Sequence, residues 1–386
     1  MKAPRPAPQW RAFLELGFRP LYLGGCVWAA LSVALWIGAP QWMHGTLGGV
    51  AWHAHEMLWG FVATIAVGFL FTAGANWSGN NPAHGRTLGA LCLLWLVARI
   101  GFLLPGQGWF LFAAGCELAF FAWAALALAR ALVRGRNRRN YGVPLLLLAL
   151  GAADALYLAA ASGGDYALLM QRFATGLQCM ALVALLIARR VIPFFAMRAV
   201  PGLDIPMLTR SGQWQLGATV LAAVSGLLGM GTVTAASLAV AGVIALAQVI
   251  AWKPLAVRSQ PLLWILYAGY AGLGAGLLVA AAHAAGWISR AAWPAHAIGV
   301  AGFSVLIIGM VTRTALGHLG QPLRTDGTMV ASYALVIAAA ALRLLALLPT
   351  AFAVPVLRAS AAAWVLAFAL YLWRFAPLLV RPRTDR

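Results

Sequence analysis

Histidine is the residue type in this sequence that is best suited to hold a metal cofactor. The segment Trp52-His53-Ala54-His55-Glu56 carries two imidazoles, and His296 follows much later in the chain. Imidazole binds iron and copper well, whereas the shortage of carboxylates argues against a magnesium, calcium or manganese site. On a regular helix, side chains two residues apart diverge, so His53 and His55 could share a site only if residues 52–54 are extended. The spacing predicts either a haem or copper site or histidines that lie at a membrane surface.

The residues around these histidines would support such a site. Glu56 is placed to orient a ligating ring through a hydrogen bond. Trp52 and Trp59 would supply part of the apolar, aromatic slot that a haem requires. Aromatic side chains are equally expected in the belt at a membrane surface, so both interpretations stay open.

A second group of residues with chemical potential consists of charges inside apolar segments, where an unpaired charge is costly. The group comprises Arg99, Glu117, Asp154, Arg172, Arg343 and Arg358. With a rise of about 1.5 Å per residue, Arg99 and Glu117 lie at similar depths on successive helices, and so do Asp154 and Arg172. We therefore expect the pairs Glu117–Arg99 and Asp154–Arg172. They either tie the helices together or line an outward-facing pocket whose arginines bind an anion, such as a haem propionate.

The elements that must position these residues are membrane-spanning helices. The chain has 386 residues, of which 63% are hydrophobic and 9% charged, whereas a soluble protein carries about 25% charged residues. This composition excludes a soluble enzyme and a disordered chain. A spanning helix needs about 20 mostly apolar residues, and twelve such stretches occur, at 19–38, 55–74, 87–104, 108–129, 144–161, 167–188, 214–230, 234–251, 262–282, 293–312, 329–348 and 355–376.

The predicted fold class is therefore all-α, a polytopic membrane helix bundle with about twelve transmembrane helices. The bundle is expected over residues 19–376, between tails at 1–18 and 377–386. Of the 27 basic residues, 22 fall in the tails and in alternate loops on one side, while the opposite loops hold only Arg290. This asymmetry predicts that both termini are cytoplasmic. It also accounts for the net charge of +19 without a nucleic-acid partner, and leaves the lipid bilayer as the expected partner.

Motifs of other chemistries are missing from the sequence. The four cysteines form no CxxC pair, which argues against a disulfide framework or a zinc site. The sequence contains no Walker A, GxSxG, HExxH or CxxCH motif, so ATPases of that type, serine hydrolases, zinc proteases and covalent c-type haem lack support.

Several motifs together resemble those of the NnrS family. They occur in order along most of the chain: Gly17-Phe18-Arg19-Pro20-Leu21-Tyr22-Leu23, Trp52-His53-Ala54-His55-Glu56-Met57-Leu58-Trp59-Gly60-Phe61, Gly68-Phe69-Leu70, Asn76-Trp77-Ser78-Gly79, Arg190-Val191-Ile192-Pro193-Phe194-Phe195, His296, Thr312-Arg313-Thr314-Ala315-Leu316-Gly317-His318-Leu319-Gly320 and Pro322-Leu323. The departures are mild, such as Leu319 where threonine is common.

The resemblance implies a twelve-helix protein of the bacterial inner membrane that contains haem and copper. It also implies a role in resistance to nitric oxide and nitrosative stress, often linked to denitrification, but no settled reaction. The metal or haem candidates that it marks are His53, His55, His296 and His318. Candidate cofactor contacts within the matched motifs are Arg19, Trp52, Glu56, Trp59, Asn76, Arg190 and Arg313, beside Arg99, Arg172, Arg343 and Arg358. His318 is predicted on the cytoplasmic side, so it belongs to a second site or is structural.

Two classes of function remain open from the sequence. One is a haem protein that protects by electron transfer from an electron donor, or by binding or converting nitric oxide or a related small ligand. The twelve helices are also similar to the catalytic subunit of haem–copper oxidases, and the analogy suggests a haem between helices 2 and 10. The other class is a transporter for haem, copper or an anion, or a factor that delivers metal to a partner.

Overall fold

In the computed structural model, the described part of the chain, residues 7–43 and 45–383, is built from helices. Ten helices among these residues are long and apolar enough to cross a membrane. The prediction of an all-α membrane bundle is therefore confirmed. His44, residues 1–6 of the predicted N-terminal tail and residues 384–386 of the predicted C-terminal tail lie outside the described residues.

Each of the twelve predicted stretches coincides with one long helical segment. Eight are single helices that could span a membrane, namely α2 (Phe18–Gly38), α6 (Gln107–Arg134), α7 (Val143–Gly163), α8 (Tyr166–Ala199), α10 (Gly231–Ala251), α11 (Pro261–Ala284), α14 (Gly327–Leu345) and α15 (Ala353–Leu379). Two more are composite and contain several helical elements each. The remaining two are α5 (Gly85–Gly101) and α9 (Thr209–Leu227), which do not meet the same length and hydropathy limits. Twelve crossings and cytoplasmic termini thus stay predictions.

Both composite segments contain an eight-residue π-helix. The first runs through α3 (Val50–His55), the π-helix η2 (Glu56–Ala63) and α4 (Thr64–Ser78). The second runs through α12 (Ala292–His296), the π-helix η5 (Ala297–Ser304) and α13 (Val305–His318). π-helical turns are rare and occur often at functional sites. In this chain each of them begins directly after a histidine.

Local sequence explains where many helices begin and end. The Asp326 carboxylate accepts a hydrogen bond from the Met329 amide at 3.1 Å and caps the start of α14. Proline stands in the first turn of α7 and of α11, where its missing N–H costs nothing. Gly79 follows α4 with a φ of 68° and Gly164 follows α7 with a φ of 74°, the left-handed conformation that ends helices. Short helices occupy several connections: α1 (Trp10–Phe13), η1 (Pro40–Trp42), η3 (Arg138–Asn140) and η4 (Pro254–Val257).

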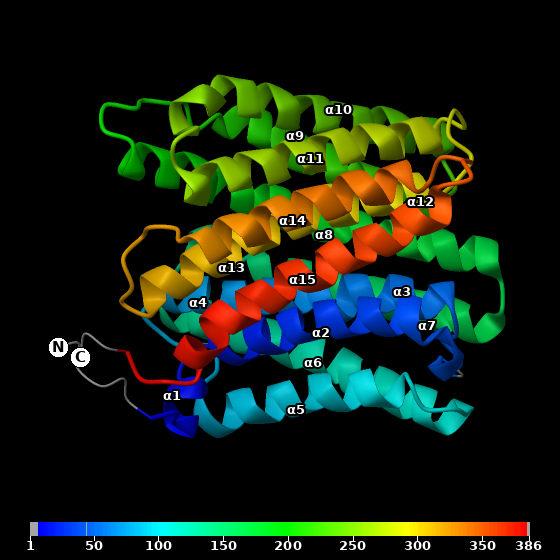
Figure 1. Ribbon diagram of the computed structural model, residues 1–386, viewed down its shortest axis with the longest axis horizontal. Coiled ribbons are helices and arrows are strands. Elements are labelled where there is room, and N and C mark those ends of the chain that lie inside the picture. Colours follow the sequence, from blue (N-terminus) through cyan, green and yellow to red (C-terminus); the bar gives the residue numbers. More distant parts are fainter. Residues whose placement is uncertain (1–6, 44, 384–386) are drawn as a thin grey trace. The chain divides into compact units, whose positions relative to one another are not determined.

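The chain divides into two compact units. Unit 1 comprises Met1–Asp165, Val311–Arg324 and Phe368–Arg386. In it α2 packs against α4 and η2, while α6 contacts α4, α5 and α7. Figure 1 shows α5 alongside α6.

Unit 2 comprises Tyr166–Met310 and Thr325–Ala367. In it α10 packs against both α9 and α11 (Figure 1), and η5 contacts α11 and α14. The contact of α11 with the segment η5–α13 is made over a row of glycines on α11, at Gly269, Gly272 and Gly276. Small residues of this kind allow two helix backbones to approach closely in a membrane protein.

Candidate functional site

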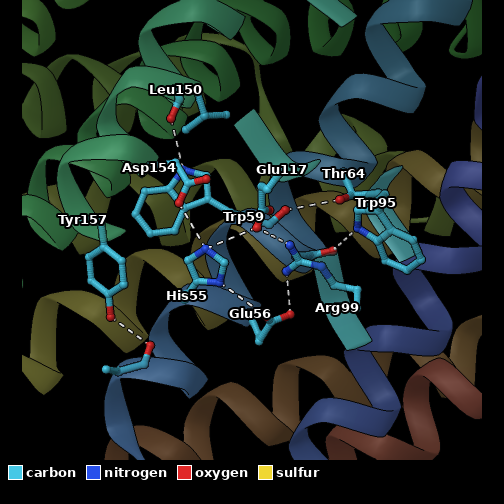
Figure 2. A network of polar contacts seen from close by, with 12 residues as sticks. His55, Glu56, Trp59, Thr64, Trp95, Arg99, Glu117, Leu150, Asp154 and Tyr157 are labelled. Carbon is cyan, nitrogen blue, oxygen red and sulfur yellow. Dashed lines mark hydrogen bonds and ion pairs between the residues drawn. The ribbon is translucent and has the colours of Figure 1, made fainter. Parts of the chain in front are cut away.

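His55 lies at the centre of a buried polar cluster in unit 1. Its Nδ1 is 3.0 Å from Glu56 Oε1, and its Nε2 is 3.1 Å from Asp154 Oδ1. The same Nε2 lies 3.4 Å from Glu117 Oε2. All four side chains are shielded from solvent. Figure 2 shows the imidazole between the carboxylates.

Arg99 joins the carboxylates on the other side of the cluster. Its Nη1 donates to Glu56 Oε2 at 2.6 Å, and its Nη2 donates to Glu117 Oε2. Trp28 Nε1 also donates to Glu56 Oε2, at 2.6 Å. The expected Glu117–Arg99 pair is therefore confirmed, and the expectation that Glu56 orients a histidine ring matches its contact with His55 Nδ1.

Five elements deliver these residues to one place. His55 ends α3 and Glu56 opens the π-helix η2, while Arg99, Glu117 and Asp154 come from α5, α6 and α7. Gly60 on η2 leaves room for the Arg99–Glu56 contact. A Cβ at this position would lie 2.6 Å from Glu56 Oε2 and closer still to Arg99 Nη1. The glycine is thus required by the ion pair that passes over it.

Aromatic side chains form the walls of the cluster. The Phe102 ring lies 4.7 Å from the His55 ring, centroid to centroid, and the Trp59 and Tyr157 rings lie at 5.4 and 5.9 Å. Trp59 Nε1 donates to the Leu150 carbonyl at 3.1 Å, and the Tyr157 hydroxyl donates to the Ala51 carbonyl at 2.8 Å. These rings exclude water from the charged groups, and a low dielectric strengthens every interaction among them.

The charges of the cluster do not balance. Three carboxylates stand beside one guanidinium, which stays protonated in proteins, and one imidazole. With a neutral ring, two negative charges are uncompensated, and burial of such charges is expensive. Among the described residues, Asp154 Oδ2 and Glu117 Oε1 are buried without a hydrogen-bond partner. Protons or a cation must therefore complete the site.

The cluster also has the ligand set of a metal site. One nitrogen of His55 and one oxygen each of Glu117 and Asp154 lie within 4.8 Å of one another. Nitrogen and carboxylate ligands of this kind suit a divalent ion, and Glu56 on the opposite ring nitrogen would hold His55 in position.

His53 lies on the same helix as His55 but in other surroundings. Residues 50–55 form regular helix, so the extended segment that would bring both rings to one site is not present. The His53 ring stacks on Trp36 with centroids 5.3 Å apart and planes 8° from parallel. The helical twist thus directs the two imidazoles to different neighbours.

Asp154 has a different partner from the one expected. We predicted Arg172, but the carboxylate contacts His55 instead, within unit 1. Arg172 lies on α8 in unit 2 and is half-buried. Depth along the helices was therefore a sound guide to which residues are embedded, and a poor one to this pairing.

The other predicted histidines lie at the ends of their helices. His296 ends α12 in unit 2, and its Nδ1 is 2.7 Å from the Ala292 carbonyl. A carbonyl can only accept, so the ring proton is on Nδ1 and Nε2 carries the lone pair of the neutral ring. His318 ends α13 in unit 1, with its ring 5.5 Å from that of Phe18.

The remaining predicted contacts are spread over both units. In unit 1, Arg19 Nη1 donates to the carbonyls of Leu379 and Arg381 at 3.1 and 2.6 Å. Trp52 packs edge-on against Trp28, Asn76 is exposed and Arg313 is buried. The predicted cofactor contacts that lie in unit 2 are half-buried or exposed, namely Arg172, Arg190, Arg343 and Arg358. Of all the predicted site residues, His55, Glu56, Trp59 and Arg99 come together in the cluster.

Sequence reasoning missed Asp154 and Glu117 as partners of His55, and it missed a short internal repeat. Trp52-His53-Ala54-His55 and Trp293-Pro294-Ala295-His296 share the pattern Trp-x-Ala-His. In both, the π-helix covers the eight residues that follow the last histidine, and a glycine stands thirteen residues after it, at Gly68 and Gly309. This shared pattern was the available signal that 52–63 and 293–304 are related segments.

A protein-family model described as "NnrS protein" matches residues 12–383, nearly the whole chain. No curated protein matches the chain.

Proposed function

The chain belongs to the NnrS family, and from this premise we propose that it is a haem- and copper-binding protein of the bacterial inner membrane that protects against nitric oxide and nitrosative stress. The observation that carries the proposal is the buried His55 cluster, which lies at a π-helical turn within a membrane-spanning segment. Structural ion pairs alone do not require a histidine held between three carboxylates.

The two cofactors fit different histidines. Both ring nitrogens of His55 already face carboxylates, so this residue does not fit as an axial ligand of haem. His296 fits that role, because its Nδ1–H donates to a backbone carbonyl, the usual partner behind a metal-ligating imidazole. We assign haem to His296. Arg172 and Arg343 of the same unit are candidates to bind its propionates.

Copper fits the His55 cluster. His55, Glu117 and Asp154 offer one nitrogen and carboxylate oxygens, a set that suits Cu(II) better than the thiolate-preferring Cu(I). A divalent ion would also compensate the excess negative charge of the cluster. The buried oxygens without partners, Asp154 Oδ2 and Glu117 Oε1, are available to contact it.

When bound, haem and copper would supply one-electron chemistry and a place for nitric oxide to bind. The side chains of the protein would hold the cofactors in place and supply charge and protons at the site. Arg99 holds Glu56 and Glu117 in fixed orientations, and Glu56 in turn orients His55. The aromatic walls exclude water. Nitric oxide is small and apolar, so it can reach a buried site through the lipid.

Visible spectra and metal analysis of purified protein test the proposal. We expect His296→Ala to lose the Soret absorbance of haem, whereas His55→Ala keeps haem and loses copper. His84→Ala, at an exposed position in the connection after α4, is the control and should keep both. In a nitrosative-stress survival assay, the His84 variant should complement a deletion strain and the other two should not.

Three results would overturn the proposal. A wild-type protein without a Soret band after haem-replete expression would exclude the haem site. Retention of both cofactors in His55→Ala and His296→Ala would remove the assigned ligands. Substrate counterflow in proteoliposomes that survives both substitutions would identify a transporter for haem, copper or an anion.

A further inference from the structure

Unit 2 contains a cavity of about 330 Å³ whose polar side chains are assigned no role in the proposed function. It lies between α8, α10, α11 and the segment from α12 into η5. Apolar side chains such as Met170, Phe173, Leu177 and Ile298 form most of its lining. The polar side chains that line it are Gln171, Thr175, Gln178, Thr234 and His283. Such a lining is typical of a site for a small ligand with few polar groups.

The hydrogen-bond donors of this lining are largely committed to backbone carbonyls. His283 Nδ1 is 2.6 Å from the Ile288 carbonyl, and Gln171 Nε2 donates to the Gly226 carbonyl at 2.8 Å. The Thr175 hydroxyl donates to the Gln171 carbonyl of its own helix at 3.1 Å, and the Thr234 hydroxyl donates to the carbonyl of Met230, just before α10, at 3.0 Å. Apart from the remaining amide N–H groups of Gln171 and Gln178, these side chains offer acceptors.

Two acceptors are distinctive. A carbonyl only accepts, so the contact with Ile288 places the proton of a neutral His283 ring on Nδ1 and leaves a lone pair on Nε2. Gln178 is 6% exposed, and its Oε1 is buried without a hydrogen-bond partner in the described part of the chain. An unsatisfied buried carbonyl oxygen is costly and calls for a donor.

We propose that this cavity binds a membrane-soluble hydroquinone, with its two hydroxyls donating to His283 Nε2 and Gln178 Oε1. The apolar walls suit a substituted ring, and a ligand of this class reaches an intramembrane cavity by diffusion in the lipid. The oxidised quinone carries carbonyls in place of hydroxyls, so it cannot satisfy either acceptor. No residue of the His55 cluster lines the cavity. His296 does not line it either, but its neighbours Pro294 and Ala295 do, so the cavity adjoins the proposed haem ligand.

Anaerobic calorimetry on the detergent-purified protein with three probes that share one trimethyl-substituted ring tests the proposal. The probes are trimethylhydroquinone, trimethylbenzoquinone and the dimethyl ether of the hydroquinone. We expect the hydroquinone to bind at least about tenfold more tightly than either of the others, because only it has two donors and each hydrogen bond contributes a few-fold in affinity. Equal binding of the three probes would mean that the cavity recognises apolar surface alone and would overturn the proposal, as would no binding of the hydroquinone.

Substitutions then locate the site. Gln178→Leu and His283→Phe should each weaken hydroquinone binding about fivefold, since each removes one acceptor while keeping a side chain of similar size. Gln213→Leu, at an exposed position of α9 outside the cavity, is the matched control and should bind as the wild type does. Wild-type affinity in both cavity variants would place the probe elsewhere and overturn the assignment. The probe comparison on the wild-type protein decides the matter if a variant does not fold.

Discussion

Arg99 is the residue on which the arrangement of the His55 cluster depends most. It is fully buried and contacts both Glu56 and Glu117. A buried ion pair is poor evidence of net stabilisation, because desolvation offsets the attraction between the charges. Removal of one partner is strongly destabilising, since it leaves the other charges buried without compensation.

At this scale we predict that Arg99→Leu destabilises the protein by about 3–5 kcal/mol, the usual cost of breaking a buried pair. Thermal melting in detergent would measure the loss. Arg130→Leu, at an exposed position of α6, is the control and should change the melting temperature little.

A combined variant tests whether uncompensated charge or lost packing causes the destabilisation in Arg99→Leu. If unpaired carboxylates cause the loss, Arg99→Leu together with Glu56→Gln and Glu117→Gln should recover part of the stability, since the amides carry no charge. A combined variant that melts no higher than Arg99→Leu alone would contradict the electrostatic explanation and point to lost packing.

The packing of α11 against the composite segment α12–η5–α13 depends on three glycines of α11. A Cβ on Gly269 would lie 2.5 Å from the Leu306 amide nitrogen, and one on Gly276 would lie 2.8 Å from the Ile298 amide nitrogen. A Cβ on Gly272 would meet the Ala301 carbonyl oxygen even more closely. These neighbours are backbone atoms, so they can give way only if a helix moves.

We therefore predict that Gly272→Ala destabilises the protein by about 1–3 kcal/mol, the cost of overpacking a core. Alanine normally stabilises a helix relative to glycine by up to about 1 kcal/mol. Gly299→Ala supplies the comparison, because a Cβ there would meet no atom within 4 Å.

Melting temperatures of the two variants should move in opposite directions, down for Gly272→Ala and unchanged or up for Gly299→Ala. A Gly272→Ala protein as stable as the wild type would show that α11 and η5 are not in close contact in the membrane.

For the whole molecule, the open question is how many times the chain crosses the membrane. Ten and twelve crossings both leave the two termini on the same side, so a reporter at the C-terminus does not distinguish them. The difference lies with α5 and α9. The arginine distribution favours twelve crossings, because it requires both helices to cross.

Reporter fusions test this locally. We predict that alkaline phosphatase is inactive when fused after His84 or Pro206 and active when fused after Pro105 or Gly229, on the two sides of α5 and α9. A fluorescent protein at the C-terminus should be fluorescent, as expected for a cytoplasmic end. Equal phosphatase activity before and after either helix would mean that this helix does not cross.

The helices of this protein, and the charged residues embedded in them, follow directly from the amino-acid pattern. A spanning helix requires about 20 consecutive apolar residues, a property of the linear sequence that needs no knowledge of long-range contacts. All twelve predicted stretches coincide with helical segments. Charges in such stretches must find partners, so Arg99, Glu117 and Asp154 stood out. Similar depths on two successive helices were enough to predict the Glu117–Arg99 pair.

Which embedded groups contact one another depends on how the helices pack. Asp154 contacts His55 and not the arginine at its own depth, and His53 turns to Trp36 while His55 enters the cluster. The π-helical turns after His55 and His296 were equally invisible to hydropathy. The physical reason is that partner choice depends on the rotation of each helix about its axis and on which helices pack together. Both are set by close contacts such as Gly60 beneath Arg99, which no pattern of apolar residues specifies.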